Sequence, residues 1–288
     1  MTEKRRFFAD IHRMANKNRK RKSDENHHVY TNDGENFSKA VKITDIPVKA
    51  GDELYVDTIP VELTDEFVEV LRRGVKVLYL RRVTMLAKKR EELGLSKNSR
   101  NDVRVMMALD PKWYREVDEN FLVMRRLITA FRNSQRIHII IVNRARAMGD
   151  AERRILMKPI KTVEEAMMEL ASRIVDEAGR RIPAYNKVVE TLGITGENHL
   201  LAREALAELM ITIDFRKGVR SIKNYLGLYR PVKGKPKYYS RSSRRALERL
   251  VMALKGTTVI TVRYQLQVLK RIREVIRTPE RLAGGHAG

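Results

Sequence analysis

The first hundred residues alternate short apolar segments with polar turns, in a pattern typical of strands connected through a helix. Residues 53–57 and 75–80 each carry closely spaced apolar side chains over the length of a strand. Residues 64–73 between them repeat apolar positions at helical spacing, with Thr64 placed to cap the helix. Two strands joined through a helix by tight connections run parallel, so residues 1–110 are predicted to form an α/β domain.

Two weaker strand signals precede this unit. A short apolar segment covers residues 7–11 and contains Asp10. Residues 28–30 lead into the turn Asn32-Asp33-Gly34, and apolar alternation resumes at residues 40–43, which predicts a β-hairpin.

Beyond Val83 the apolar pattern is helical until the tail. In residues 111–181, apolar side chains recur at spacings of three and four with charged residues between them. Two long helices are therefore predicted, joined within residues 149–162. We interpret this segment as a helical linker or dimerisation hairpin.

Residues 182–288 are predicted to form an all-helical domain that opens with the turn Gly193-Ile194-Thr195-Gly196. A turn of this form between two helices can present backbone N–H groups to a phosphate, as in helix-hairpin-helix modules. The alternative is an ordinary C-capping glycine followed by a new helix.

The tail segment, residues 225–247, combines several groups that bind phosphodiesters. A helix end breaks at Gly227, the chain crosses a turn rich in Pro, Gly and Lys, and a new helix starts behind serines and arginines. Backbone donors, cations and hydroxyls on one surface favour nucleic acid as the partner.

Charge supports the same interpretation. The chain has 288 residues, with 59 Lys and Arg against 36 Asp and Glu, a net charge of +23. Such a charge repels itself unless a polyanion compensates it. The basic residues are concentrated in residues 1–22 and 216–249, which predicts two places where phosphates are held.

Cysteine is absent, which excludes disulfides, cysteine zinc sites and thiol nucleophiles. Unbroken apolar runs such as residues 139–142 are too short to span a bilayer, and no signal-peptide pattern follows the charged N-terminus. We therefore expect a cytoplasmic protein without a membrane partner.

Several motifs together resemble a known family. Residues 74–108 contain a Gly-x-x-Val strand, a basic helix and a helix start with Lys97, Ser99, Asp102 and Val103 at the family's motif positions. The tail segments YLGLYRP and SRSSRRAL follow in the family's order. In these features the chain resembles the DEDD transposases of the insertion-sequence 110 family, which includes the Piv-type invertases.

The resemblance implies a RuvC/RNase H-like N-terminal domain with four acidic residues that bind Mg²⁺ for phosphodiester cleavage. Asp10, Asp57 and Asp102 take three of these positions, as catalytic residues and metal ligands. The third position of the family's set falls on Ser99.

The resemblance also implies a nucleophilic serine just after the Tyr-x-Gly-Leu turn. Residues 230–235 contain no serine. Ser240 and Ser242 are the nearby candidates, although serines before a helix are commonly N-caps.

These features predict an insertion-sequence transposase or DNA recombinase. Metal-assisted strand exchange is assigned to the first domain, and DNA or guide-RNA binding to the last. The resemblance also implies a homo-oligomer. The predicted nucleic-acid contacts are Gly193, Thr195, Gly196, Arg230, Lys233, Lys235, Lys237, Arg241, Arg244 and Arg245. The alternatives are a non-enzymatic nucleic-acid-binding protein derived from a transposase, and an RNA-binding component of a ribonucleoprotein.

Overall fold

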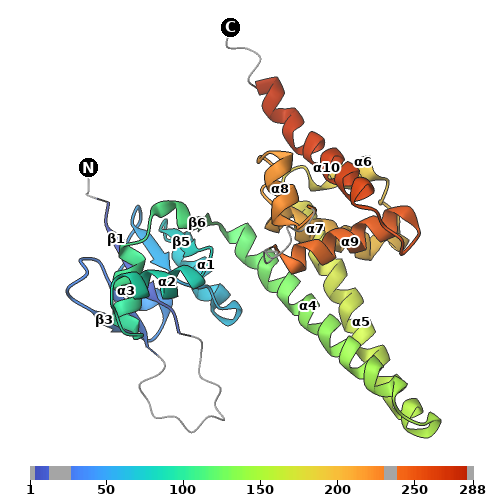
Figure 1. Cartoon of the computed structure of the whole chain (residues 1–288), viewed down its shortest axis with the longest axis horizontal. Helices are drawn as coiled ribbons and strands as arrows, with labels where there is room; N and C mark the ends of the chain where they lie inside the picture. Colours follow the sequence, from blue (N-terminus) through green and yellow to red (C-terminus); the bar gives the residue numbers. More distant parts are fainter. Residues whose placement is uncertain (1–3, 13–26, 230–238, 284–288) are drawn as a thin grey trace. The chain divides into compact units, whose positions relative to one another are not determined.

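The computed structural model describes residues 4–12, 27–229 and 239–283, with side chains up to residue 278 in the last helix. It divides into two compact units, Met1–Arg126 and Leu127–Gly288. The fold class is mixed α/β, as expected, with a six-stranded sheet and mostly helical structure elsewhere (Figure 1).

The sheet of the first unit has the strand order β3-β2-β1-β4-β5-β6. Its central strands β1, β4 and β5 are parallel, whereas β2, β3 and β6 run antiparallel to their neighbours. The parallel pair predicted for residues 53–57 and 75–80 is thus confirmed as β4 and β5. The strand bounds are β1 Arg6–Asp10, β2 His28–Thr31, β3 Ser38–Ala40, β4 Glu53–Val56, β5 Lys76–Leu80 and β6 Tyr114–Val117.

Helices cover both faces of this sheet. Alternate side chains of β1 and β4, such as Phe7 and Leu54, pack with α1 (Thr64–Arg72) and two 3₁₀ turns, η1 (Ile43–Asp45) and η2 (Val61–Leu63). The intervening side chains, such as Phe8 and Tyr55, pack with α2 (Thr84–Glu92) and α3 (Ser99–Met107). This division follows from the alternation of strand side chains between the two faces of a sheet.

Three local expectations for this unit were wrong. The hairpin's second strand is Ser38–Ala40, and residues 43–45 form the 3₁₀ turn η1, because Ile43 turns inward as a fully buried core residue. Thr64 does not cap α1: it is the first helical residue, and its hydroxyl donates to the Val61 carbonyl oxygen at 2.7 Å.

The third error concerns the segment after residue 83, which is not wholly helical. After α3 and the 3₁₀ turn η3 (Pro111–Trp113), strand β6 adds to the edge of the sheet beside β5. The Tyr114 ring of β6 packs edge-on against the Tyr55 ring, with centroids 4.9 Å apart, so tertiary packing fixes this short strand.

A long helical hairpin begins the second unit. Helix α4 (Glu119–Arg146) starts in the first unit and continues into the second, and α5 (Asp150–Arg181) returns beside it (Figure 1). His138 Nε2 lies 2.9 Å from Glu164 Oε1 across the pair. Two long helices are confirmed, but their junction is much shorter than residues 149–162, because Pro159 lies inside α5.

In the rest of the second unit, α7 (Leu200–Thr212) packs against α5 and α9 (Arg241–Lys255). The other elements are α6 (Tyr185–Leu192), the 3₁₀ turn η4 (Glu197–His199), α8 (Val219–Tyr225) and α10 (Val262–Ala283), and α10 packs on α6 and α9. Buried side chains of α7 and α9, among them Leu206 and Leu250, form the core. Within the described residues, no helix is long and apolar enough to cross a membrane.

Replacing Gly227 with alanine is expected to destabilise the second unit more than replacing Gly256. Both glycines have left-handed φ angles, 66° and 65°. A Cβ at Gly227 would meet the Tyr239 ring at 2.6 Å, whereas nothing lies within 4 Å at Gly256. Left-handed strain costs about 1–2 kcal/mol at each site, and overpacking adds about 1–3 kcal/mol at Gly227 alone. Chemical denaturation of the two variants measures the difference; equal losses would contradict the Tyr239 contact.

Candidate functional site

Asp10 and Asp57 lie side by side at the carboxyl ends of β1 and β4. The parallel register pairs Phe8 with Tyr55 and Ala9 with Val56, so the next pair is Asp10 and Asp57. Adjacent strands are about 4.8 Å apart. The Phe8 and Tyr55 rings stack at 4.7 Å on the α3 face, and alternation places both aspartates on that same face.

Asp102 approaches this pair from α3, which packs on β1 and β2. The three predicted carboxylates are therefore brought together from three elements. Asp57 Oδ1 accepts a hydrogen bond from the Ile11 N–H at 2.9 Å, which holds the end of β1 against β4.

Like charge and burial perturb these acids. Burial, followed by the charge of Asp10, raises the pKa of Asp57 to about 7. Burial also raises the pKa of Asp102, with Asp10 adding to the effect and Arg90 opposing it. Carboxyl groups whose pKa is raised by burial and by a neighbouring carboxylate are candidates for functional sites.

His12 lies inside the carboxylate cluster and was not predicted as a site residue. Its Nε2 is 3.1 Å from Asp10 Oδ2 and 3.1 Å from Ser99 Oγ. The hydrogen bond with Asp10 raises the pKa of His12 against the lowering effect of burial. The His12 N–H donates to Nδ1 of His28, whose pKa burial lowers to about 4.

The sequence contains one signal for His12, its position two residues after Asp10 in a strand-end segment. Alternation places i and i+2 side chains on the same side of an extended chain. That signal is weak, because β1 ends at Asp10 and the path of the chain beyond it depends on packing.

Arg90 is the second residue that the sequence did not identify. Its Nη1 lies 2.8 Å from Asp102 Oδ1, and both side chains are largely buried. The α2–α3 contact thus supplies a cation to one of the three carboxylates, because α2 packs directly on α3.

Two other acids considered for a four-carboxylate set lie elsewhere. Glu53 begins β4, at the opposite end from Asp57, and pairs with Lys4 and Arg6. Asp110 caps η3 by accepting from the Lys112 N–H at 2.9 Å.

The donor types fit Mg²⁺, which prefers carboxylate oxygens. Among the described residues, however, no three His, Asp or Glu side chains are already grouped as ligands of one ion. Metal binding therefore requires rearrangement of side chains, beginning with the Asp10–His12 and Asp102–Arg90 contacts.

The predicted serines lie at the start of α9. Ser240 is its N-cap and accepts a hydrogen bond from the Ser243 N–H at 3.3 Å. Ser240 Oγ is also 2.8 Å from Ser243 Oγ and 3.3 Å from Ser242 Oγ. Ser243 is fully buried and its hydroxyl reaches Thr212 of α7. Ser240 and Ser243 therefore have structural roles at this helix start.

The turn between α6 and α7 has a left-handed Gly193 as the C-cap of α6 and Gly196 as the N-cap of η4. The Ile194 N–H donates to the Val189 carbonyl at 3.1 Å, and Ile194 is buried, as in a Schellman C-cap. Thr195 is exposed.

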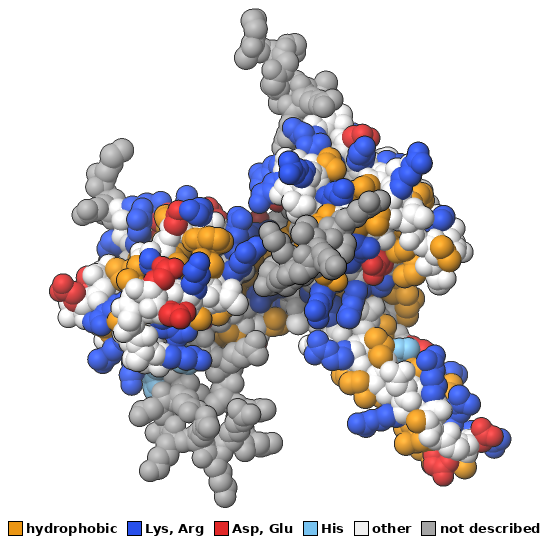
Figure 2. Space-filling model, in the orientation of Figure 1, with side chains coloured by type: hydrophobic (Ala, Val, Ile, Leu, Met, Phe, Trp, Pro, Cys, Tyr) orange, Lys and Arg blue, Asp and Glu red, His pale blue; other side chains and the backbone are white. Residues whose placement is uncertain are grey.

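The predicted cations divide into two groups. Arg241 and Arg245 are exposed on α9, whereas Arg244 is half-buried and pairs with Glu248 at 2.7 Å. Lys and Arg side chains are abundant on the visible face of the second unit (Figure 2). Arg230, Lys233, Lys235 and Lys237 lie outside the described residues.

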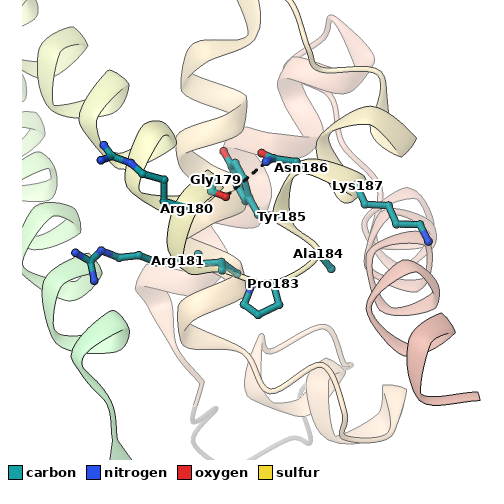
Figure 3. A pocket seen from close by; sticks show the side chains of 9 residues that line it. Gly179, Arg180, Arg181, Pro183, Ala184, Tyr185, Asn186 and Lys187 are labelled. Atoms are coloured by element: carbon teal, nitrogen blue, oxygen red, sulfur yellow. Dashed lines mark hydrogen bonds between the residues drawn. The ribbon is translucent and has the colours of Figure 1, made fainter. Parts of the chain in front are cut away.

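A pocket of about 360 Å³ is lined by residues 179–187, at the α5–α6 junction. It contains none of the predicted site residues. Figure 3 shows Arg180 and Arg181 pointing to one side and Lys187 to the other. Because its cations do not converge, this pocket is not assigned a ligand.

No protein-family model matches this chain, and no curated protein matches it. The functional assignment therefore depends on the residues and their geometry.

Proposed function

We propose that the protein is a transposase or DNA recombinase of the insertion-sequence type, with a RuvC-like first unit. The observation that carries this proposal is the convergence of Asp10, Asp57 and Asp102 from β1, β4 and α3. For the three aspartates to form one site, β1 and β4 must be parallel and α3 must pack over the sheet near Asp10 and Asp57. In the first unit β1 and β4 are parallel, and α3 packs on β1 and β2.

Asp10, Asp57 and Asp102 are the residues that would hold Mg²⁺, and the mutual repulsion of their charges favours a divalent cation. When bound, Mg²⁺ supplies charge stabilisation for the attacking and leaving oxygens of a phosphodiester. Asp57 is positioned for this role by the Ile11 N–H, which fixes one of its oxygens.

The second unit is proposed to bind the DNA or guide-RNA backbone. The N-terminal half of α9 exposes Arg241 and Arg245, and the Gly193–Gly196 turn follows the end of α6. Arginine side chains and backbone N–H groups both contact phosphates without reading base sequence. Homo-oligomer formation, the guide RNA and a cytoplasmic location stay predictions of the sequence.

A second candidate function is nucleic-acid binding without catalysis. Two observations favour it: Ser99 stands where the family has an acid, and Ser240 is used as an N-cap. A transposase derivative of this kind, including a ribonucleoprotein component, would retain salt-sensitive binding to DNA or RNA.

Asp102→Asn is expected to abolish strand exchange while leaving binding intact. Supercoiled DNA carrying the flanking element ends is incubated with the protein, its co-purified RNA and Mg²⁺. The substitution keeps the shape of Asp102 and removes one of the three charges. Asp110→Asn, at an exposed cap, is the control and should react like the wild type. Binding without cleavage by the wild type would favour the non-catalytic alternative.

A further inference from the structure

Two tyrosine rings are exposed where α8 ends and α9 begins. Tyr225 is the last residue of α8 and is 43% exposed, although Leu226 and Leu228 beyond it are buried. Tyr239 precedes Ser240, the N-cap of α9, and is 38% exposed. The Ser240 N–H donates to the Tyr225 carbonyl oxygen at 2.9 Å. This hydrogen bond joins the two backbone segments that carry the rings.

Both rings are held by contacts at one end. The Tyr225 hydroxyl oxygen lies 3.5 Å from the Oγ of Ser243, which is fully buried. The base of the Tyr239 ring lies against Gly227, where a Cβ would come within 2.6 Å of Tyr239 Cγ. Side chains that are positioned before a ligand arrives lose less conformational entropy on binding it. The two tyrosines are therefore suited to contact a ligand through their exposed surface.

Positive charge surrounds these rings in the sequence and on the two helices. Residues 215–255 contain one acid, Glu248, and it pairs with Arg244 at 2.7 Å. Arg220 of α8 and Arg241 and Arg245 of α9 are exposed. A surface with this balance of charge attracts polyanions. Cations that contact phosphates and aromatic rings that stack on bases are the two components of single-strand binding surfaces.

A double helix offers no partner for the exposed rings along its length. Its bases are paired and stacked on one another, so their faces are covered, whereas an unpaired base can be splayed out and stacked on an aromatic side chain. The cations contact the backbone of either form. The tyrosines thus distinguish single strands from duplex.

We propose that Tyr225 and Tyr239 stack on unpaired bases, so that the second unit binds single-stranded nucleic acid in preference to duplex. This inference rests on the nucleic-acid binding of the proposed function and specifies the form of the strand that is bound. Stacking is tolerant of base sequence, because every base has a π-face. The preference is therefore for the state of the strand and does not require a particular sequence.

The test measures binding of the full-length protein to four labelled oligonucleotides by fluorescence anisotropy. They are a thymidine tract, a uridine tract, an abasic strand and a duplex whose ends are closed by non-nucleoside linkers, all with the same number of phosphates. The wild type is expected to bind at least one tract at least about fivefold more tightly than the abasic strand or the duplex, because only the tracts offer open base faces. Tighter binding of the uridine tract would identify RNA as the preferred strand, and tighter binding of the thymidine tract would identify DNA.

Variants attribute this preference to the rings. Tyr225→Leu and Tyr239→Leu are each expected to weaken binding of the preferred tract at least about fivefold and to leave the abasic strand unaffected. Tyr225→Phe keeps the ring and should bind like the wild type. Tyr264→Leu is the matched control, because the Tyr264 ring lies 5.8 Å from Nζ of Lys255 at the opposite end of α9. Circular dichroism of each variant verifies that it is folded.

The outcomes separate this inference from the function on which it rests. Equal affinity of the wild type for the abasic strand and both tracts would overturn the role of the tyrosines and retain backbone binding. Tighter binding of the duplex than of either tract would also overturn it. Displacement of the tract by polyglutamate as effectively as by unlabelled tract would indicate a surface for acidic protein segments and overturn the inference. A wild type that binds none of the four at physiological ionic strength would overturn nucleic-acid binding and this inference together.

Discussion

Asp57→Asn is expected to eliminate metal-dependent cleavage and, in the absence of metal, to stabilise the fold. Asp57 is buried beside Asp10 at the end of β4, and its pKa is raised to about 7. Loss of one ligand removes several kcal/mol of transition-state stabilisation, a decrease in rate of about 10³-fold or more. The amide keeps an oxygen for the Ile11 N–H, so the contact between β1 and β4 survives.

The stability change has a defined pH dependence. The pKa of Asp57 rises from 3.8 to about 7 on folding, so ionisation is less favourable in the folded state. The wild type therefore loses stability relative to Asp57→Asn as pH increases from about 4 to about 7, and the loss is complete above that range. Three pKa units correspond to about 4 kcal/mol, which sets the upper limit of the gain.

Thermal unfolding at pH 4 and pH 8, with chelator present, measures this effect. The variant's advantage should be large at pH 8 and small at pH 4. Asp110→Asn provides the opposite control, because its neighbours hold the pKa of Asp110 below the ordinary value. An Asp57→Asn variant that cleaves DNA at the wild-type rate would exclude Asp57 from the site. A gain in stability that is independent of pH would contradict the burial of its charge.

All three aspartates were assigned through the family resemblance, and strand pattern and order explain afterwards why Asp10 and Asp57 converge. Alternation in β1 and β4 places Asp10 and Asp57 on one face, and parallel pairing places them at one edge. Helix α1 predicts the parallel pair of β4 with β5, whereas the pairing of β1 with β4, which brings Asp10 beside Asp57, was not predicted. Asp102 required the family resemblance, because the position of α3 over β1 is set by packing and has no signature in local sequence.

His12 and Arg90 show why the remainder of the site could not be predicted. His12 enters the cluster through the path of the chain after β1, and Arg90 through the packing of α2 on α3. Helix α2 buries only Leu86, so its amino-acid pattern does not define which face meets α3. Contacts of this kind depend on tertiary structure, whereas strands and amphipathic helices have a local period.

An ionic cluster that was not predicted from the sequence is buried in the second unit. Glu204 and Glu208, one turn apart on α7, are fully buried. Arg249 of α9 reaches them at 2.8 and 3.2 Å, and Arg132 of α4 reaches Glu208 at 2.6 Å. Burial raises the pKa of Glu204 to about 7, with Arg249 opposing this effect. The cluster joins α9, which carries the proposed phosphate contacts, to the helical core.

Arg249→Met is therefore expected to destabilise the protein by about 3–5 kcal/mol at pH 8, because it removes a positive charge from beside two buried glutamates. Of the two arginines in the cluster, Arg132 would remain, in contact with Glu208. The loss should be smaller at pH 5, below the pKa of Glu204, where that carboxyl group is neutral. Chemical denaturation at the two pH values measures both changes.

Arg245→Met is the matched control, since Arg245 is exposed on the same helix and its replacement should change stability by less than about 0.5 kcal/mol.

The double variant Glu204→Gln/Arg249→Met should recover part of the loss at pH 8, because one buried charge is removed together with its partner. A loss that is equal at both pH values, with no recovery in the double variant, would show that Arg249 acts through packing on the Phe131 ring, 5.8 Å from its guanidinium carbon. Recovery would instead establish that α9 is held in place by charge compensation, and DNA binding should then weaken in Arg249→Met as α9 loosens.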